Sequence, residues 1–254
     1  MSEFSIRFNS GYDITVPNPP GTDTPTEVQK IIDRLNAVHD YRGTLLKERF
    51  KDDLSRLNGR RTVFIGDSIT RDNLGYRATV TLAGKPKACN LAVSGTISAM
   101  LLNKFKRSVK SFKPELVSIM IGGNDALLTG DEQLPSVSIT EYKRNVSAFV
   151  RWAKEAGAAV LLFEITPIHE ARFKAHYDGK EKYQTNENIS SYNGVLKEIS
   201  LEYDIPLYPN GWLSENPDLY YEKDGIHLSE KGHEAFALKW MEYAVETCKE
   251  HANE

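Results

Sequence analysis

A serine, Ser68, lies at a point in the sequence where a hydroxyl group can act as a nucleophile. A short apolar run, Val63–Ile65, predicts a buried strand that stops at Gly66, and a segment with helical character begins at Ile69. Glycine tolerates a sharp turn there. The unpaired N–H groups that open a helix attract negative charge, so this turn can stabilise an oxyanion beside the hydroxyl. The alternative is an ordinary helix cap, and we expect Asp67 to hold the turn in that way.

A carboxylate and an imidazole follow each other near the end of the chain. The segment Asp224-Gly225-Ile226-His227 stands directly before a predicted helix. The Asp224 carboxylate can accept the proton on one ring nitrogen of His227 and fix the tautomer. The other nitrogen is then free to take a proton from a serine. His233 lies inside the following helix, where packing or exposure is expected instead.

Two further turns follow predicted strands and carry hydrogen-bond donors. Gly95 can bring a backbone N–H close to a ligand because it has no side chain in the way. Asn124, in the segment Gly122–Asp125, offers a carboxamide of the kind that stabilises tetrahedral oxyanions. Each segment alone also suits an ordinary turn. Taken together, we expect the N–H groups of Ser68 and Gly95 and the Asn124 side chain to bind one oxyanion.

The elements that must position these residues alternate along the chain from Thr62 onward. The predicted strands are Thr62–Ile65, Ala88–Ala92, Leu116–Ile121, Val160–Ile165 and Ile205–Tyr208. The predicted helices are Ile69–Thr81, Ser98–Lys110, Thr140–Ala156, Asn188–Tyr203 and Ser229–Lys249. Apolar strands alternating with helices indicate a parallel sheet that is covered on both faces. Ligands bind such sheets at the C-terminal ends of the strands, where the polar turns described above are found.

Residues 1–61 are predicted to form an N-terminal arm and helical extension, separate from a catalytic domain at 62–254. The alternation in Ser2–Val16 suggests a short edge strand, and the proline-rich segment Pro17–Gly21 breaks regular structure. Thr24 can cap the start of a helix, and apolar residues then recur at helical spacing within Pro25–Asn58. None of these residues carries a catalytic signal.

Composition narrows the classes of protein to which the chain can belong. The 254 residues carry a formal net charge of -3, which argues against a nucleic-acid binder driven by bulk charge. The two cysteines, Cys89 and Cys248, fit structural roles in a reducing compartment. We expect no membrane span and no signal peptide, hence a cytoplasmic location, with virion association or non-classical export left open. Because there is no zinc-type cluster and no phosphate-binding glycine loop, we expect no metal or cofactor.

The order of these motifs resembles the SGNH hydrolase superfamily, also called the GDSL family of esterases and lipases. The resemblance covers about Thr62–Glu246 and does not extend to Met1–Arg61. One departure is Ile69, where the family name implies leucine. The motifs that carry the resemblance are Gly66-Asp67-Ser68, Gly95 within Val93-Ser94-Gly95-Thr96, Gly122-Gly123-Asn124-Asp125 and Asp224-Gly225-Ile226-His227.

The resemblance implies a three-layer α/β/α fold with a flavodoxin-like parallel sheet. It also implies hydrolysis of a carboxylic ester through an acyl-enzyme, with Ser68 as nucleophile, His227 as base and Asp224 as its partner. Another serine hydrolase class, the α/β-hydrolases, has the elbow Gly-x-Ser-x-Gly. Here the fifth position is Thr70, and Asp224 and His227 are only three positions apart. Both features argue against that class.

The sequence says less about the substrate. We expect a short acyl group, such as acetyl on a carbohydrate or small alcohol, because no long apolar groove is visible. Lipid esters and thioesters stay open, as does a hydrolase-like binding module, although every catalytic position is filled. The stretch Thr166–Asn188 is predicted to be a loop that walls the site. Trp212, Tyr220 and Tyr221 either stack on a sugar ring or pack in the core or at the rim.

Overall fold

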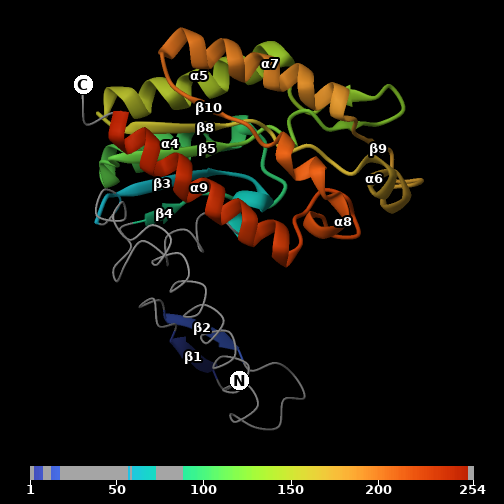
Figure 1. Ribbon diagram of the computed structural model, residues 1–254, viewed down its shortest axis with the longest axis horizontal. Coiled ribbons are helices and arrows are strands. Elements are labelled where there is room, and N and C mark those ends of the chain that lie inside the picture. The colour runs from blue at the N-terminus through green and yellow to red at the C-terminus, as the bar shows by residue number, and fades with distance from the viewer. Residues whose placement is uncertain (1–2, 8–12, 18–56, 58, 73–87, 251–254) are drawn as a thin grey trace.

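A five-stranded parallel sheet forms the centre of the molecule. The computed structural model describes residues 3–7, 13–17, 57, 59–72 and 88–250, and the structural statements below concern these residues. The strands lie in the order β10-β8-β5-β3-β4 (Figure 1). Numbered along the chain and read from β4, this is the 2-1-3-4-5 order of flavodoxin-like folds. The strands are β3 (Thr62–Gly66), β4 (Ala88–Asn90), β5 (Leu116–Met120), β8 (Ala159–Phe163) and β10 (Leu207–Tyr208).

Helices cover both faces of this sheet, so the predicted three-layer α/β/α fold is confirmed. Helices α4 (Ser98–Phe112), α5 (Ile139–Glu155) and α7 (Asn186–Tyr203) pack on one face, and α9 (Glu230–Glu250) packs on the other (Figure 1). Neighbouring residues of β3 serve the two layers in turn, as the pleat of a strand requires. Val63 and Ile65 lie in the core under α4 and α5, whereas Phe64 packs against Trp240 of α9.

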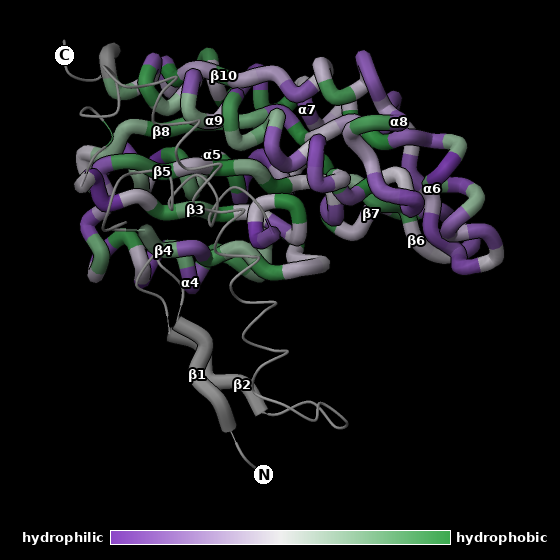
Figure 2. Tube along the Cα trace, turned by 60° about the horizontal axis from the view of Figure 1, so that its bottom comes forward, coloured by the Kyte–Doolittle hydropathy of each residue, from purple (hydrophilic) through white to green (hydrophobic). Residues whose placement is uncertain are grey.

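The predicted strands and helices of the sheet are found with their ends shifted by a few residues. The strand predicted to run to Ala92 ends at Asn90, whose side chain accepts a hydrogen bond from the Ala92 N–H, although the Leu91 N–H still donates to the Phe64 carbonyl of β3. A helical turn begins at Ser68, but most of the helix predicted for Ile69–Thr81 lies outside the described residues. The hydrophobic residues concentrate along the central strands (Figure 2).

The prediction of a loop at Thr166–Asn188 is wrong. This segment contains α6 (Glu170–His176) and β9 (Lys182–Tyr183), and it ends within the first turn of α7. Strand β9 pairs with β6 (Leu128–Thr129), which also pairs with β7 (Leu134–Pro135), so the three form a small antiparallel sheet. Each element is too short to show a hydrophobic period of its own.

Two short elements and a hairpin complete the described chain. The 3-10 helix η2 (Gly211–Glu215) and helix α8 (Pro217–Tyr220) precede the Asp224 loop. Near the N-terminus, β1 (Glu3–Arg7) and β2 (Asp13–Pro17) pair with each other as an antiparallel hairpin, where one edge strand was expected. The helices predicted for Pro25–Asn58 lie outside the described residues apart from Leu57, which is buried with α9. The domain division at residue 61 stays a prediction.

Two further findings concern the cysteines and the character of the helices. Cys89 and Cys248 are not joined by a disulfide; Cys89 is half-buried and Cys248 is buried. Among the helices of the described chain, none combines the length and the apolar character needed to cross a bilayer.

Candidate active site

The turn after β3 is fixed by contacts that leave the Ser68 hydroxyl at its apex. Asp67 accepts a hydrogen bond from the Ile69 N–H at 3.1 Å, as expected for a residue that holds the turn. The Thr70 hydroxyl donates to the Met120 carbonyl at 3.3 Å and so ties the turn to the end of β5. A Cβ on Gly66 would lie 2.1 Å from Thr70 Oγ1, so only glycine can occupy this position without a shift of its neighbours.

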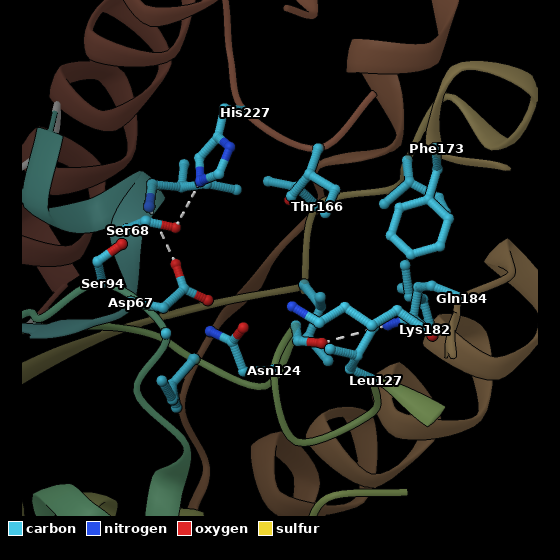
Figure 3. A pocket seen from close by; sticks show the side chains of 18 of the residues that line it. Asp67, Ser68, Ser94, Asn124, Leu127, Thr166, Phe173, Lys182, Gln184 and His227 are labelled. Carbon is cyan, nitrogen blue, oxygen red and sulfur yellow. Dashed lines mark hydrogen bonds between the residues drawn. The ribbon is translucent and has the colours of Figure 1, made fainter. Parts of the chain in front are cut away.

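Ser68, His227 and Asp224 form one hydrogen-bonded line. His227 Nε2 lies 2.9 Å from Ser68 Oγ, and His227 Nδ1 lies 2.5 Å from Asp224 Oδ2 (Figure 3 shows the first of these contacts). The other Asp224 oxygen accepts hydrogen bonds from the N–H groups of Ile226 and His227, each at 3.0 Å. The carboxylate is therefore held rigidly while it orients the imidazole ring toward the serine.

The pKa values of the two carboxylates near Ser68 are shifted in opposite directions. Burial alone would raise the pKa of Asp224, but the hydrogen bonds from the His227 ring and from two backbone N–H groups lower that pKa below its ordinary value. Asp67 is only 7% exposed, and burial raises its pKa from 3.8 to about 6, against the opposing effects of the Ile69 N–H and the His227 ring. Asp224 is thus suited to partner an imidazolium, whereas Asp67 lies beside the nucleophile as a costly buried charge.

The Asp224 loop is held by backbone contacts and by one buried tyrosine. The His169 N–H donates to the Gly225 carbonyl at 2.8 Å, and the Glu222 N–H donates to the His227 carbonyl at 2.8 Å. Tyr221 is 4% exposed, and its hydroxyl donates to the Pro167 carbonyl.

The aromatic residues before this loop pack in the core and at its rim. The ring of Trp212 contacts those of Tyr220 and Phe236, and Tyr221 is buried as described above. None of the three aromatic residues considered for sugar stacking lines the cavity at Ser68. Of the two roles weighed for them, the structure therefore supports packing.

The predicted oxyanion residues face the same cavity as Ser68 and His227. This cavity has a volume of about 280 Å³, and Gly95 and Asn124 both line it. Asn124 Nδ2 donates one hydrogen bond to the Thr96 carbonyl at 3.2 Å, which orients the amide and leaves its second N–H without a partner among the described residues. The structure thus brings together all five site residues that the sequence predicts, with Asp224 behind His227.

A buried network that the sequence did not predict connects the two turns on this side. The Asp125 carboxylate accepts hydrogen bonds from the N–H and hydroxyl of Ser98, and the Asn145 amide donates to the Ser98 hydroxyl at 3.0 Å. Asp125 is fully buried, and burial raises its pKa. The network joins the start of α4, just after Gly95, to the turn that carries Asn124.

The opposite wall comes from the segment predicted to cover the site, and this part of the prediction is confirmed. Six of its residues line the cavity: Thr166, Ile168, Phe173, Tyr177, Lys182 and Gln184. The Gln184 amide donates to the Gly123 carbonyl at 3.2 Å, so this wall is tied to the turn of Asn124 (Figure 3). The aromatic and polar richness of the segment was its only signal in the sequence.

The fold and this constellation agree with what comparison with known proteins shows. A model of the GDSL-like Lipase/Acylhydrolase family matches residues 64–235, and the chain belongs to that family. Like the members of this family, the protein is an acylhydrolase of the esterase, lipase and thioesterase type.

The sequence identity to individual relatives is low, but the similarity covers most of the chain. The chain is 27% identical over 169 residues to the uncharacterized lipoprotein YqeF of Bacillus subtilis, covering 58% of this chain and 69% of that protein. It is 25% identical over 202 residues to thioesterase 1/protease 1/lysophospholipase L1 of Escherichia coli K12, covering 74% and 85%. The solved structure of an acetylxylan esterase from Geobacillus stearothermophilus superimposes with a TM-score of 0.54 at 21% identity, covering 73% of this chain and 94% of the other.

Proposed function

We propose that the protein hydrolyses short-acyl carboxylic esters through an acyl-enzyme formed on Ser68. The observation that carries the proposal is the hydrogen-bonded line from Asp224 through His227 to Ser68, with contacts of 2.5 and 2.9 Å. A serine is a weak nucleophile until a neighbouring base removes its proton. In this site the base is within reach, and a carboxylate fixes its tautomer.

The reaction proceeds in two halves. Ser68 Oγ attacks the ester carbonyl carbon while His227 Nε2 takes the hydroxyl proton, and a tetrahedral intermediate forms. The N–H groups of Ser68 and Gly95 and the Asn124 amide stabilise the oxyanion. His227 then gives its proton to the leaving alkoxide, and the acyl-enzyme results. A water molecule, deprotonated by His227, attacks this acyl group, and Ser68 recovers its proton as the carboxylic acid leaves. No cofactor takes part in the proposed reaction.

The size of the cavity supports a short acyl group. Its volume of about 280 Å³ lies just below the usual range for small-molecule sites, about 300 to 1,000 Å³. An acetyl group on a carbohydrate or small alcohol is the form we favour. The structural likeness to an acetylxylan esterase supports the fold, and that enzyme's substrate is one to test here.

The second candidate is a thioesterase or lipase acting on longer acyl chains. It is favoured by apolar side chains in the cavity lining, of which Leu127 and Phe173 lie across the cavity from Ser68 (Figure 3). The side chains concerned are Leu127, Ile165, Ile168, Phe173 and Ile189. A medium acyl chain would find apolar surface there.

A chain-length series separates the two candidates. The purified protein is assayed with p-nitrophenyl esters from acetate to laurate, beside acetylated sugars and an acyl thioester. We expect kcat/KM to be highest for the shortest acyl groups and to fall once the chain exceeds the cavity. A maximum at medium or long chains assigns the function to the second candidate. If no ester is cleaved and a serine-directed phosphonate leaves Ser68 unlabelled, the chain is a hydrolase-like binding module.

The proposal also covers the cellular location of the protein and the class of molecule on which it acts. We place the reaction in the cytoplasm, on a small-molecule or carbohydrate ester and without nucleic acid. Fractionation of the native host cell, with detection of the intact chain, tests this location. Recovery outside the cytoplasm overturns it.

A further inference from the structure

The cavity at Ser68 carries opposite charges at its two ends. Asp67 lines it beside the nucleophile, and Lys182 lines it from the far wall. Figure 3 shows Lys182, Gln184 and Phe173 across the cavity from Ser68 and His227. Within the described part of the chain, Lys182 is the only lysine or arginine among the lining residues. The site therefore has one permanent positive charge, and it lies away from the bond to be broken.

Strand pairing directs Lys182 toward the cavity. Strand β9 pairs with β6, with Lys182 opposite Thr129 and Tyr183 opposite Leu128. Successive side chains in a strand point to opposite sides, so Lys182 and Gln184 share one side and Tyr183 takes the other. Consistently, Lys182 and Gln184 line the cavity and Tyr183 does not, although both Lys182 and Tyr183 are partly open to solvent.

An aromatic ring positions the ammonium group of Lys182, and no carboxylate among the described residues pairs with its charge. It lies over the ring of Tyr177, 5.3 Å from the ring centre, as does the ammonium of Lys180. Other lysines, such as Lys143 with Glu198 at 2.7 Å, pair with carboxylates. No carboxylate among the described residues makes an ion pair with Lys182. A cation that is held by an aromatic ring, and not by an acid, keeps its charge available for a ligand.

We propose that Lys182 selects esters whose end remote from the scissile bond carries a carboxylate or phosphate. Asp67 disfavours an anion near Ser68, and Lys182 favours one at the far wall, so the two charges fix the direction in which such a substrate binds. This inference rests on the proposed esterase function, and it narrows the substrate to an anionic ester. Lys182 is a specificity residue and takes no part in bond breaking.

Matched ester pairs test the proposal. One pair is mono-p-nitrophenyl glutarate and its neutral methyl ester, which places the charge on the acyl part. A second pair is para-acetoxybenzoate and its methyl ester, which places the charge on the alcohol part. para-Acetoxyphenyl phosphate tests phosphate in place of carboxylate.

Three variants are compared with the wild type. Lys182→Gln removes the charge, Lys182→Arg keeps it, and Lys180→Gln is the control. Lys180 shares the Tyr177 ring but does not line the cavity.

We expect the wild-type protein to prefer the anionic member of at least one pair. In Lys182→Gln this preference falls by about 3- to 10-fold through KM, since a partly exposed charge pair has that order of effect. Lys182→Arg and Lys180→Gln keep the preference, and high salt reduces it in the wild type. Turnover of the neutral esters falls less than that of the anionic esters in Lys182→Gln, and it stays at the wild-type level in Lys180→Gln, which lies outside the cavity lining.

Two results overturn the inference while leaving the esterase function intact. They are equal turnover of anionic and neutral esters by the wild type, or an unaltered preference in Lys182→Gln. Calorimetric binding of glutarate to Ser68→Ala, with and without Lys182→Gln, provides a readout that needs no turnover. Loss of all ester turnover with retained charge-dependent glutarate binding contradicts the proposed function and supports the role of Lys182. Binding that is insensitive to Lys182→Gln contradicts that role.

Discussion

His227 Nε2 lies 2.9 Å from Ser68 Oγ, although 159 positions separate the two residues in the chain. The serine is fixed at the end of β3, and the histidine is fixed by the loop that precedes α9. Both segments lie at the C-terminal edge of the sheet, where the strand ends meet. The contact is therefore a product of the sheet topology, and the roles proposed for these residues depend on it.

Removing the base should cost more activity than weakening its orientation. Asp224→Asn keeps the shape of the side chain but loses the charge that stabilises the imidazolium. His227→Ala removes the proton acceptor itself. We expect kcat to fall in both variants and further in His227→Ala, with melting temperatures near that of the wild type. Steady-state kinetics with p-nitrophenyl acetate measures the difference, and equal or reversed losses argue against this division of roles.

The Asn124 amide should act mainly on kcat. Its orientation by the Thr96 carbonyl leaves an N–H facing the cavity. Asn124→Ala should lower kcat by a factor on the order of 10²–10³ with a smaller change in KM, as for other oxyanion donors. Asn103→Ala, an exposed change on α4, is the control. An unchanged kcat in Asn124→Ala returns Asn124 to the role of a turn residue.

Asp67 should make the protein less stable as the pH rises. Its pKa in the folded protein is about 6, above the ordinary value of 3.8, so the folded state binds a proton more tightly than the unfolded state does. The favourable contribution is complete below about pH 4 and is lost as the pH rises through about 6, a change on the order of 3 kcal/mol.

Asp67→Asn removes this pH dependence while its side-chain oxygen still accepts the Ile69 N–H. We expect the variant to gain about 2 kcal/mol of stability relative to the wild type between pH 4.5 and pH 7.5, which is most of the full change. Urea denaturation at both pH values measures the gain, with the exposed Asp178→Asn as control. A parallel pH profile for Asp67→Asn and the wild type contradicts the burial of this charge.

Gly66→Ala should destabilise the fold, because the added Cβ would meet Thr70 Oγ1 at 2.1 Å and the Met120 carbonyl at 2.5 Å. We expect a loss of about 1–3 kcal/mol, as for other overpacked sites. Gly194→Ala in α7 is the matched control. Its Cβ would meet nothing within 4 Å, and we expect a gain of about 0.5–1 kcal/mol. Thermal denaturation compares the two, and a neutral Gly66→Ala means that the turn relaxes.

Local patterns in the sequence were sufficient to predict the sheet and to place the candidate site residues at one edge of it. Buried strands appear as apolar runs, and the polar turns that follow them lie at one edge once the sheet is parallel. Ser68, Gly95, Asn124 and the Asp224/His227 pair could therefore be placed together before any coordinates. Their roles stay proposals until the variants are measured.

The missed features depend on contacts between distant segments. Helix α6 and strand β9 are too short to show a hydrophobic period, and β9 exists because it pairs with β6. The partners of Asp125 are Ser98 and, through it, Asn145, and no local pattern connects these three residues. The position of Lys182 in the cavity follows from the same long-range pairing.

The central claim is that Ser68 is the nucleophile, and the most direct test is a comparison of Ser68→Ala with Ser111→Ala. Ser111 is exposed on α4 and undergoes the same chemical change. The measurement is turnover of p-nitrophenyl acetate, with mass spectrometry of the protein after treatment with a serine-directed phosphonate. We expect that Ser68→Ala folds normally, loses ester turnover and takes up no phosphonate, whereas Ser111→Ala behaves as the wild type. Retained turnover in purified Ser68→Ala would contradict it.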